Sequence, residues 1–276
     1  MNNAMMDAVQ AANRDSSMQA EQPLLTVDGL TKLYAPGKGC MDVNFNLYPG
    51  EVLGIVGESG SGKTTLLETL SARLQPDRGS ILYHQKEGAV ADIYEMTESR
   101  RRQLLRSDWG VVHQHPRDGL RMNVSAGANI GERLMAVGNR HYGDIRKVGL
   151  EWLKAVEIDE NRIDDQPRTF SGGMQQRLQI ARNLVTNPRL IFMDEPTGGL
   201  DVSVQARLLD LLRNLVMELQ LSVIIVTHDL AVARLLADRL MVMRRGKVVE
   251  QGLTDQILDD PQHPYTQLLV SSVLTP

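Results

Sequence analysis

The spacing of hydrophobic residues along the chain predicts strands towards both ends and helices between them. Val43, Phe45 and Leu47 alternate with polar residues, which is the period of a half-buried strand. Residues 24–30 also favour a strand. Apolar strands are expected at residues 51–56, 190–193 and 221–226. Shorter features are a helix at residues 63–73, a turn and strand at 76–83, and a polar excursion at 86–92.

Helical patterns fill the middle of the chain. Residues 202–219 read as a helix between the last two apolar strands, which is the signature of a parallel βαβ unit. Residues 126–186 are mostly helical, with Leu150, Leu153 and Val156 spaced three apart on one face. The pattern therefore predicts a parallel α/β core with a helical insert.

The order of these elements sets the expected domain organisation. A tail at residues 1–23 lacks any apolar period and is expected to be disordered. One folded domain spans residues 24–276, with a helical subdomain inserted at about residues 115–187 and a hairpin at 241–251 about Arg245 and Gly246. No internal repeat is present, so we expect one such unit. Ligand sites of parallel sheets lie at the carboxyl ends of the strands.

Composition narrows the class of protein. The 276 residues are 42% hydrophobic and 23% charged with a net charge of -4, which argues against the basicity of nucleic-acid-binding proteins. The basic run at residues 100–102 is interpreted as the solvated face of a short helix. A single cysteine, Cys40, excludes an internal disulfide framework and favours a reducing compartment. No transmembrane run or signal peptide is recognisable, so we expect a cytoplasmic protein.

Residues 57–64 match the phosphate-loop pattern G-x-x-x-x-G-K-[ST] in full. The glycines let backbone N–H groups converge on nucleotide phosphates, and the following helix adds its positive end. Lys63 supplies a point charge, and the Thr64 hydroxyl can bind Mg²⁺. Because an apolar strand precedes the loop and a helix follows it, a glycine-rich turn without a ligand is a poorer interpretation. The candidate nucleotide-binding residues of this stretch are Gly57, Glu58, Ser59, Gly60, Ser61, Gly62, Lys63, Thr64 and Thr65.

Two carboxylates, Asp194 and Glu195, follow the apolar strand at residues 190–193. Carboxylates at the mouth of a buried strand are costly unless they meet a cation or a reacting group. Asp194 is expected to hold Mg²⁺, and Glu195 to polarise the attacking water as general base. In isolation the pair would fit a solvated helix start better, but the phosphate loop reverses that preference.

The stretch at residues 170–177, Phe-Ser-Gly-Gly-Met-Gln-Gln-Arg, resembles the signature motif of ATP-binding-cassette (ABC) ATPases. Ser171 before Gly172 and Gly173 starts a helix whose free N–H groups suit a phosphate. The resemblance, from Leu24 to the end, implies the P-loop NTPase fold of an ABC nucleotide-binding domain. That fold has a mainly parallel core sheet, an antiparallel β subdomain and a helical subdomain. The family's ATPases work as homodimers in which this motif completes the site of a second protomer.

The other residues of the family's set occur in order. Tyr34 resembles the aromatic that stacks on adenine, Gln114 the Q-loop glutamine that touches Mg²⁺, Asp201 the D-loop aspartate of the dimer interface, and His228 the switch histidine at the γ-phosphate. Alone, Tyr34 would fit a core aromatic better, and His228 would be undecided.

With ATP and Mg²⁺ bound, the resemblance implies three catalytic residues and three metal-binding residues. The catalytic set is Glu195, His228 and Lys63, and the metal set is Thr64, Gln114 and Asp194. Nucleotide binding without turnover is disfavoured, because Glu195 and His228 are both present.

Two kinds of partner remain open. Residues 260–269, with the run His-Pro-Tyr-Thr, resemble the tail of dipeptide and oligopeptide importer ATPases. Residues 113–121 and the Gly-Gly-Leu-Asp run at 198–201 depart from those importers and resemble the cassette proteins of bacterial carbon–phosphorus lyase systems, which serve phosphonate catabolism. That resemblance implies soluble lyase core subunits as partners. The alternative is the membrane permease of a peptide- or phosphonate-type importer, with the chain peripheral to the inner membrane. No nucleic-acid partner is expected, and one cysteine cannot hold the iron–sulfur cluster that lyase chemistry needs.

Overall fold

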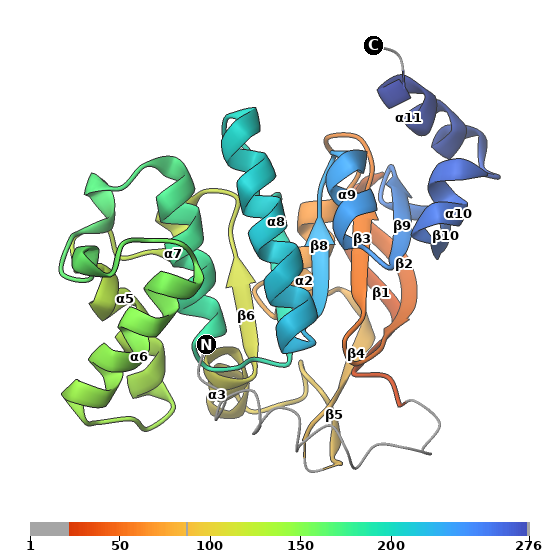
Figure 1. The fold of residues 1–276 in the computed structure, drawn as a ribbon. Helices are drawn as coiled ribbons and strands as arrows, with labels where there is room; N and C mark the ends of the chain where they lie inside the picture. Colours follow the sequence, from red (N-terminus) through yellow and green to blue (C-terminus); the bar gives the residue numbers. More distant parts are fainter. Residues whose placement is uncertain (1–21, 87, 275–276) are drawn as a thin grey trace.

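The chain is described by a computed structural model over residues 22–86 and 88–274, and Figure 1 shows how its elements are arranged. The disordered tail expected at residues 1–23 lies outside the described residues, except for Gln22 and Pro23. Two sheets form one side of the described part, and a block of helices lies beside them (Figure 1).

An antiparallel sheet comes from the first third of the chain, in the strand order β2-β1-β4-β5. Its strands are β1 (Leu25–Ala35), β2 (Lys38–Leu47), β4 (Arg78–His84) and β5 (Val90–Asp92). Val43, Phe45 and Leu47 are all buried, so the predicted half-buried strand is confirmed. β5 falls in the region where the sequence pattern predicts a polar excursion. Its pairing with β4, and not a hydrophobic period, makes this strand.

The core sheet has the strand order β10-β9-β3-β8-β7-β6. Its strands are β3 (Val52–Val56), β6 (Trp109–Val112), β7 (Leu190–Asp194), β8 (Ser222–Val226), β9 (Arg239–Arg244) and β10 (Lys247–Leu253). All neighbours are parallel except β9 and β10. The predicted βαβ unit is confirmed, because α8 (Val202–Leu219) joins the parallel pair β7 and β8. The predicted hairpin is confirmed too, with Arg245 and Gly246 at φ 47° and 81° in its turn.

The core sheet separates two hydrophobic cores, because successive residues of a strand face opposite sides. Leu53 and Ile55 of β3 join the core shared with the antiparallel sheet and α2 (Lys63–Leu70). Val52 and Val56 join the core under α8 and α9 (Leu230–Leu236). The helix after the phosphate loop therefore lies between the two sheets, while α8 and α9 cover the other face (Figure 1). The remaining helices around the sheets are α3 (Glu98–Ser107), α10 (Thr254–Asp259) and α11 (Pro264–Leu274).

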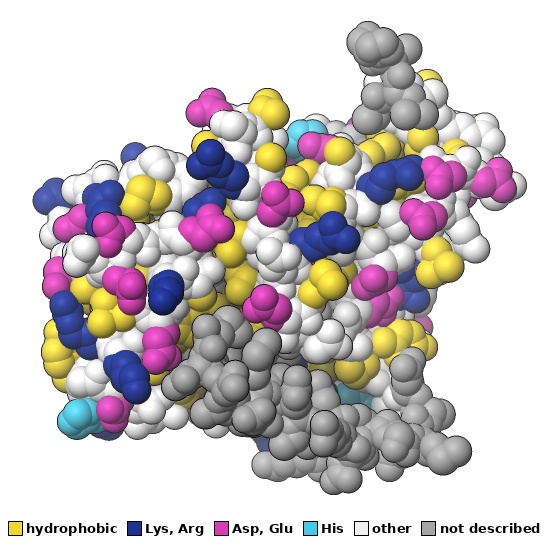
Figure 2. All heavy atoms as spheres, in the orientation of Figure 1, with side chains coloured by type: hydrophobic (Ala, Val, Ile, Leu, Met, Phe, Trp, Pro, Cys, Tyr) yellow, Lys and Arg dark blue, Asp and Glu magenta, His cyan; other side chains and the backbone are white. Residues whose placement is uncertain are grey.

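A block of helices lies between β6 and β7 in the chain and at one side of the core sheet, on the left in Figure 1. It contains α4 (Pro116–Gly119), α5 (Ala126–Ala136), α6 (Tyr142–Ala155), the 3-10 turns η1 (Glu160–Arg162) and η2 (Pro167–Thr169), and α7 (Gly172–Leu184). Ile130, Leu153 and Leu178 join it to the core under α8. Figure 2 shows acidic and basic side chains interspersed over this face of the molecule. No helix in the described ranges has the length and hydropathy needed to span a bilayer.

Two buried amide side chains of α7 attach this block to the edge of the core sheet. Asn183 accepts a hydrogen bond from the Val111 N–H at 3.0 Å and donates to the Val111 carbonyl at 2.9 Å. Gln179 makes the same pair of bonds with His113, at 2.6 and 3.1 Å. Because β6 is the edge strand of the sheet, these amides stand where the next strand would pair. They fix the backbone immediately before Gln114.

Candidate functional site

The predicted phosphate loop, residues 57–62, connects the carboxyl end of β3 to the first residue of α2. Gly57 and Gly62 have φ angles of 150° and 105°, which side chains rarely tolerate. A Cβ at Gly57 would lie 2.2 Å from the Met243 carbonyl oxygen, and one at Gly62 would lie 2.0 Å from the Gly39 carbonyl oxygen. The loop can therefore pack this closely against β2 and β9 only with glycine at both positions.

The start of α2 offers donors suited to an anion. Its first intrahelical bond runs from the Leu66 N–H to the Gly62 carbonyl at 2.9 Å, so the N–H groups of residues 63–65 have no partner within the helix. The Ser61 hydroxyl is buried and has no hydrogen-bond partner in the described part of the chain. A buried polar group without a partner is costly, and a phosphate oxygen would satisfy it. The loop and helix start thus fit a nucleotide phosphate.

Lys63 is buried beside this loop, with only 6% of its surface exposed. Its Nζ donates to the carbonyls of Gly57 at 2.7 Å and Glu58 at 2.9 Å. Burial lowers the pKa of Lys63 from its ordinary value, while the negative charges of Glu195 and Asp194 oppose that shift. The ammonium group therefore lies between the phosphate loop and the acidic end of β7.

Gln114, Glu195 and His228 meet at the ends of three adjacent parallel strands, β6, β7 and β8. Gln114 Nε2 donates to Glu195 Oε2 at 3.2 Å, and His228 Nδ1 lies 2.9 Å from Glu195 Oε1. The three residues are far apart in sequence, but parallel strands bring their carboxyl ends to one edge. The residue predicted to be the general base is therefore held from both sides by two other predicted site residues.

The backbone of Glu195 is itself unusual. Its φ of 40° lies in the left-handed region that residues other than glycine seldom adopt. The Glu195 N–H donates to the Val226 carbonyl of β8 at 2.8 Å, and its carbonyl accepts from the Gly198 N–H at 2.9 Å. Such a conformation costs on the order of 1–3 kcal/mol and persists where surrounding structure enforces it, often at active sites. Here it turns the carboxylate towards its two partners.

Asp194 is the last residue of β7 and is half-buried. Burial raises the pKa of Asp194 to about 6, and the neighbouring charge of Glu195 adds to the rise. No group of three His, Cys, Asp or Glu side chains within the described residues could hold a metal alone. Mg²⁺ typically takes one or two protein oxygens together with phosphate oxygens. Asp194 fits that role, since a cation would relieve the repulsion between its carboxylate and that of Glu195.

The predicted signature motif forms the exposed start of α7. The Ser171 hydroxyl accepts from the Met174 N–H at 3.3 Å and caps the helix. Gly173 is buried against α8, where a Cβ would lie 2.5 Å from a valine side chain. Ser171, Gly172 and Asp201 are exposed, and no hydrogen bond or ion pair of the described residues joins them to the phosphate loop. Within one chain, the fold does not bring these residues together with residues 57–64.

Tyr34 lies near the end of β1 with 62% of its surface exposed. It is not a core aromatic, so its ring is accessible to a planar ligand.

One contact of the phosphate loop was not predicted from the sequence. The Tyr265 hydroxyl accepts a hydrogen bond from the Glu58 N–H at 2.9 Å. The only signal in the sequence was the place of Tyr265 in the run His-Pro-Tyr-Thr, which indicated a family but no role.

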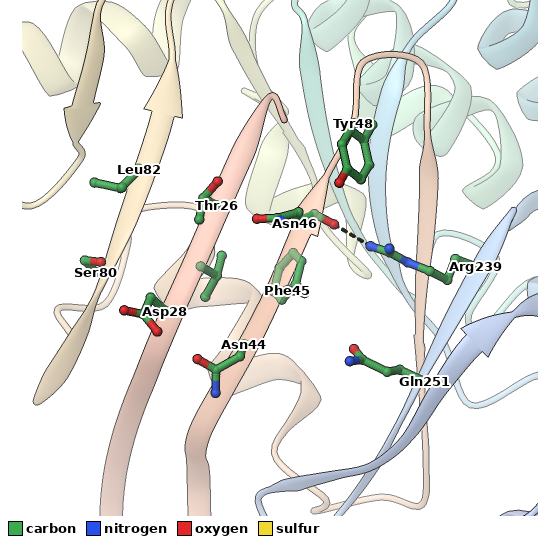
Figure 3. Close-up of a pocket in the computed structure, with 11 residues that line it drawn as sticks. Thr26, Asp28, Asn44, Phe45, Asn46, Tyr48, Ser80, Leu82, Arg239 and Gln251 are labelled. Carbon is green, nitrogen blue, oxygen red and sulfur yellow. Dashed lines mark hydrogen bonds between the residues drawn. The ribbon is translucent and has the colours of Figure 1, made fainter. Parts of the chain in front are cut away.

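A separate pocket, shown in Figure 3, lies beside the antiparallel sheet. Asp28, Asn44 and Gln251 line it, and Arg239 donates a hydrogen bond to the Asn46 carbonyl at its edge. None of the predicted nucleotide-binding residues contributes to its lining. This pocket is therefore distinct from the candidate site.

The sequence matches two family profiles and is similar to individual ATP-binding proteins. The profile of the family described as ABC transporter matches residues 40–198, and that of the oligopeptide/dipeptide transporter C-terminal region matches residues 249–276. PhnK of Escherichia coli (strain K12), named as a phosphonates utilization ATP-binding protein, is 73% identical over 253 residues, covering 92% of this chain and 98% of PhnK. The oligopeptide transport ATP-binding protein OppD of Bacillus subtilis (strain 168) is 39% identical over 241 residues, covering 84% of this chain and 66% of OppD.

Solved structures resemble the chain as well. A dimeric structure of a post-hydrolysis state of the ATP-binding cassette MJ0796, bound to ADP and Pi, superposes with a TM-score of 0.73 at 30% identity, covering 83% of this chain and 98% of that one. The structure of cbiO1 from Clostridium perfringens, described as part of the ABC transporter complex cbiONQ, has a TM-score of 0.70 at 30% identity, covering 87% and 92% of the two chains.

Proposed function

Because this chain belongs to the ABC transporter family and is an ABC-type ATPase, we propose that it couples ATP hydrolysis to the carbon–phosphorus lyase core complex in phosphonate catabolism. Its fold is that of an ABC nucleotide-binding domain. We assign residues 24–276 to this domain, with residues 115–187 as its helical subdomain. The site residues and the partner are parts of the proposal.

The contacts around Glu195 carry the catalytic part of the proposal. One carboxylate oxygen accepts from Gln114 Nε2 and the other lies against His228 Nδ1. A carboxylate has about four lone-pair sites, so Glu195 keeps capacity to accept a proton from water. We assign Glu195 as the general base, His228 as the residue that holds it, and Lys63 as the cation that stabilises charge on the phosphates.

Bound Mg²⁺ would supply positive charge that stabilises the phosphate oxygens during transfer. Thr64, Gln114 and Asp194 are the residues proposed to hold it. The Gln114 amide nitrogen already contacts Glu195, so its oxygen is the atom left for a cation.

We also propose that two copies of the chain form the complete site. The N-terminal end of α7 and Asp201 are exposed and do not reach the phosphate loop of their own chain. Val202, next to Asp201, is 82% exposed, so an apolar side chain is available beside Asp201 for a contact with a second copy. The MJ0796 cassette, which this chain resembles, is described as dimeric. Ser171, Gly172, Gly173 and Asp201 of one copy would then meet residues 57–65 and Tyr34 of the other.

Mixing two inactive variants tests the dimer. In a heterodimer of Lys63→Ala and Ser171→Arg chains, both lesions fall in one composite site and the other site is intact. ATPase activity should therefore reappear on mixing, although neither homodimer has it. Subunit exchange without recovered activity would show that the two residues act in one chain.

The lyase partner is favoured by one observation. The 73% identity to PhnK, over 98% of that protein, far exceeds the 39% identity to OppD. PhnK is named for phosphonates utilization, so the same role is proposed here. We expect a cytoplasmic protein that co-purifies from the soluble fraction with lyase core subunits when its host grows on a phosphonate.

Arg117 offers a variant that separates docking from catalysis. It lies in α4, just after Gln114, is exposed, and makes no hydrogen bond or ion pair with the site among the described residues. Arg121 is a poorer choice because it forms an ion pair with Glu132 at 3.5 Å. We expect Arg117→Glu to weaken co-purification while basal ATPase activity stays within about threefold. The matched control is Arg213→Glu on the exposed face of α8, which should bind lyase subunits normally.

The importer remains the second candidate because the oligopeptide/dipeptide transporter C-terminal profile matches residues 249–276. Recovery of the tagged chain with an integral membrane permease, in detergent extracts and without lyase subunits, would establish that function instead.

A further inference from the structure

The hydroxyl of Tyr265, in α11, reaches the phosphate loop from the far end of the chain. It accepts a hydrogen bond from the Glu58 N–H at 2.9 Å, across 207 residues of sequence. The same peptide unit has the Gly57 carbonyl at its other end, and that carbonyl accepts from Lys63 Nζ at 2.7 Å. One peptide plane is therefore held on one side by the predicted catalytic lysine and on the other by Tyr265.

A glycine precedes this peptide, so the chain itself restrains its rotation little. Gly57, which precedes it, has φ 150° and no side chain to limit rotation. Because a peptide unit rotates as a rigid plane, turning it would remove the Gly57 carbonyl from Lys63 and the Glu58 N–H from Tyr265 together. The bond to Tyr265 does not involve the Lys63 ammonium group, so it stays available when that group bonds to a phosphate.

Tyr265 is itself fixed on the hairpin that supports the loop. It is 6% exposed, and the Arg244 guanidinium of β9 lies 4.6 Å from its ring centroid. Its N–H donates to His263 Nδ1 at 3.0 Å. In β10, the Glu250 carboxylate accepts from the N–H groups of Gln262 at 2.7 Å and His263 at 3.1 Å.

The turn of the same hairpin also contacts the phosphate loop, since the Gly246 N–H donates to the Ser61 carbonyl at 2.8 Å. Two ends of the loop, at Glu58 and Ser61, are thus held by one structural unit. That unit consists of the β9–β10 hairpin and the segment 260–267 that Glu250 anchors to it.

We propose that Tyr265 is a positioning residue of the nucleotide site, which holds the Gly57–Glu58 peptide in the orientation that phosphate binding requires. The C-terminal segment around residues 260–267 thereby becomes part of the ATP-binding apparatus. The inference rests on the proposed assignment of residues 57–64 as the phosphate loop.

Tyr265→Phe tests this role because it removes the hydroxyl and keeps the ring that packs under Arg244. We expect the Kd and KM for ATP to rise about two- to tenfold, the factor that one hydrogen bond is worth. The kcat should stay within about twofold, since Tyr265 touches neither Glu195 nor His228. Hydrogen exchange at the Glu58 amide, followed by NMR on the full chain, should become faster.

Tyr94→Phe is the matched control. It removes the hydroxyl of a half-buried tyrosine, which donates to the carbonyls of Thr69, at the other end of α2, and of Leu74, just after that helix. Its ATP affinity should stay at the wild-type value. An unchanged KM in Tyr265→Phe, or an equal loss in both variants, would overturn the proposal.

Two further variants keep the outcome unambiguous. Glu250→Gln keeps the Tyr265 hydroxyl but weakens the hydrogen bonds that anchor residues 262 and 263. It should raise the KM for ATP as well, and it can be measured even if Tyr265→Phe does not fold. Lys63→Ala tests the phosphate loop itself. Normal ATP binding and turnover in Lys63→Ala would refute the site assignment, whereas a normal Tyr265→Phe beside an inactive Lys63→Ala would refute only the role of Tyr265.

Discussion

Replacing Gln179 by alanine tests how strongly the edge strand β6 depends on α7. The Gln179 side chain is fully buried, and its Oε1 accepts from the His113 N–H at 2.6 Å. The His113 carbonyl would keep a second donor, Gln176 Nε2 at 3.3 Å, but the His113 N–H would lose its acceptor. An unpaired buried donor costs about 1–3 kcal/mol, and the lost side-chain volume adds to this. We therefore expect Gln179→Ala to lower the free energy of unfolding by about 2–3 kcal/mol.

For a domain of this size, each kcal/mol lowers Tm by roughly 2–4 °C, so Tm should fall by about 4–12 °C in differential scanning calorimetry. Turnover should fall as well, because His113 directly precedes Gln114 and its contact with Glu195. Gln103→Ala makes the same chemical change on the exposed face of α3 and should shift stability by less than about 0.5 kcal/mol. Equal Tm values for the two variants would show that the hydrogen bonds between Gln179 and His113 contribute nothing to stability, and the reasoning would be wrong.

Three further predictions concern the site and the core. Glu195→Gln should reduce kcat by roughly 10²–10⁴-fold while ATP still binds, and retention of more than about a tenth of wild-type turnover would exclude Glu195 as the base. EDTA should abolish hydrolysis, and Thr64→Ala should raise the Mg²⁺ concentration needed for half-maximal activity; ATPase activity that survives chelation would contradict the metal site. Cys40 is fully buried and burial raises the pKa of its thiol to about 11, so it should react with a thiol reagent at pH 8 only after unfolding, and rapid labelling of the native protein would contradict its placement.

α8 and α2 show what the spacing of apolar residues can and cannot predict about a helix. The period of α8 predicted residues 202–219, and the helix has those bounds, because the apolar stripe itself covers the core sheet. The helix predicted at residues 63–73 ends at Leu70 instead. Ala72 takes φ 58°, and the Tyr94 hydroxyl bonds to the Thr69 and Leu74 carbonyls. A contact with a later segment therefore accompanies the end of this helix, and the apolar period of residues 63–73 does not encode that contact.

The sequence by itself determined the features that depend on neighbours in the chain. The phosphate loop needs glycines and a lysine at set spacings, and the carboxylates of β7 follow directly from an apolar run, so both were recognisable without coordinates. Only the tertiary structure decided which of these meet. The order of the parallel strands brings Gln114 and His228 to the two sides of Glu195. The contact of Tyr265 with Glu58 depends on the packing of a C-terminal helix against a loop 207 residues away, where periodicity carries no information about the partner.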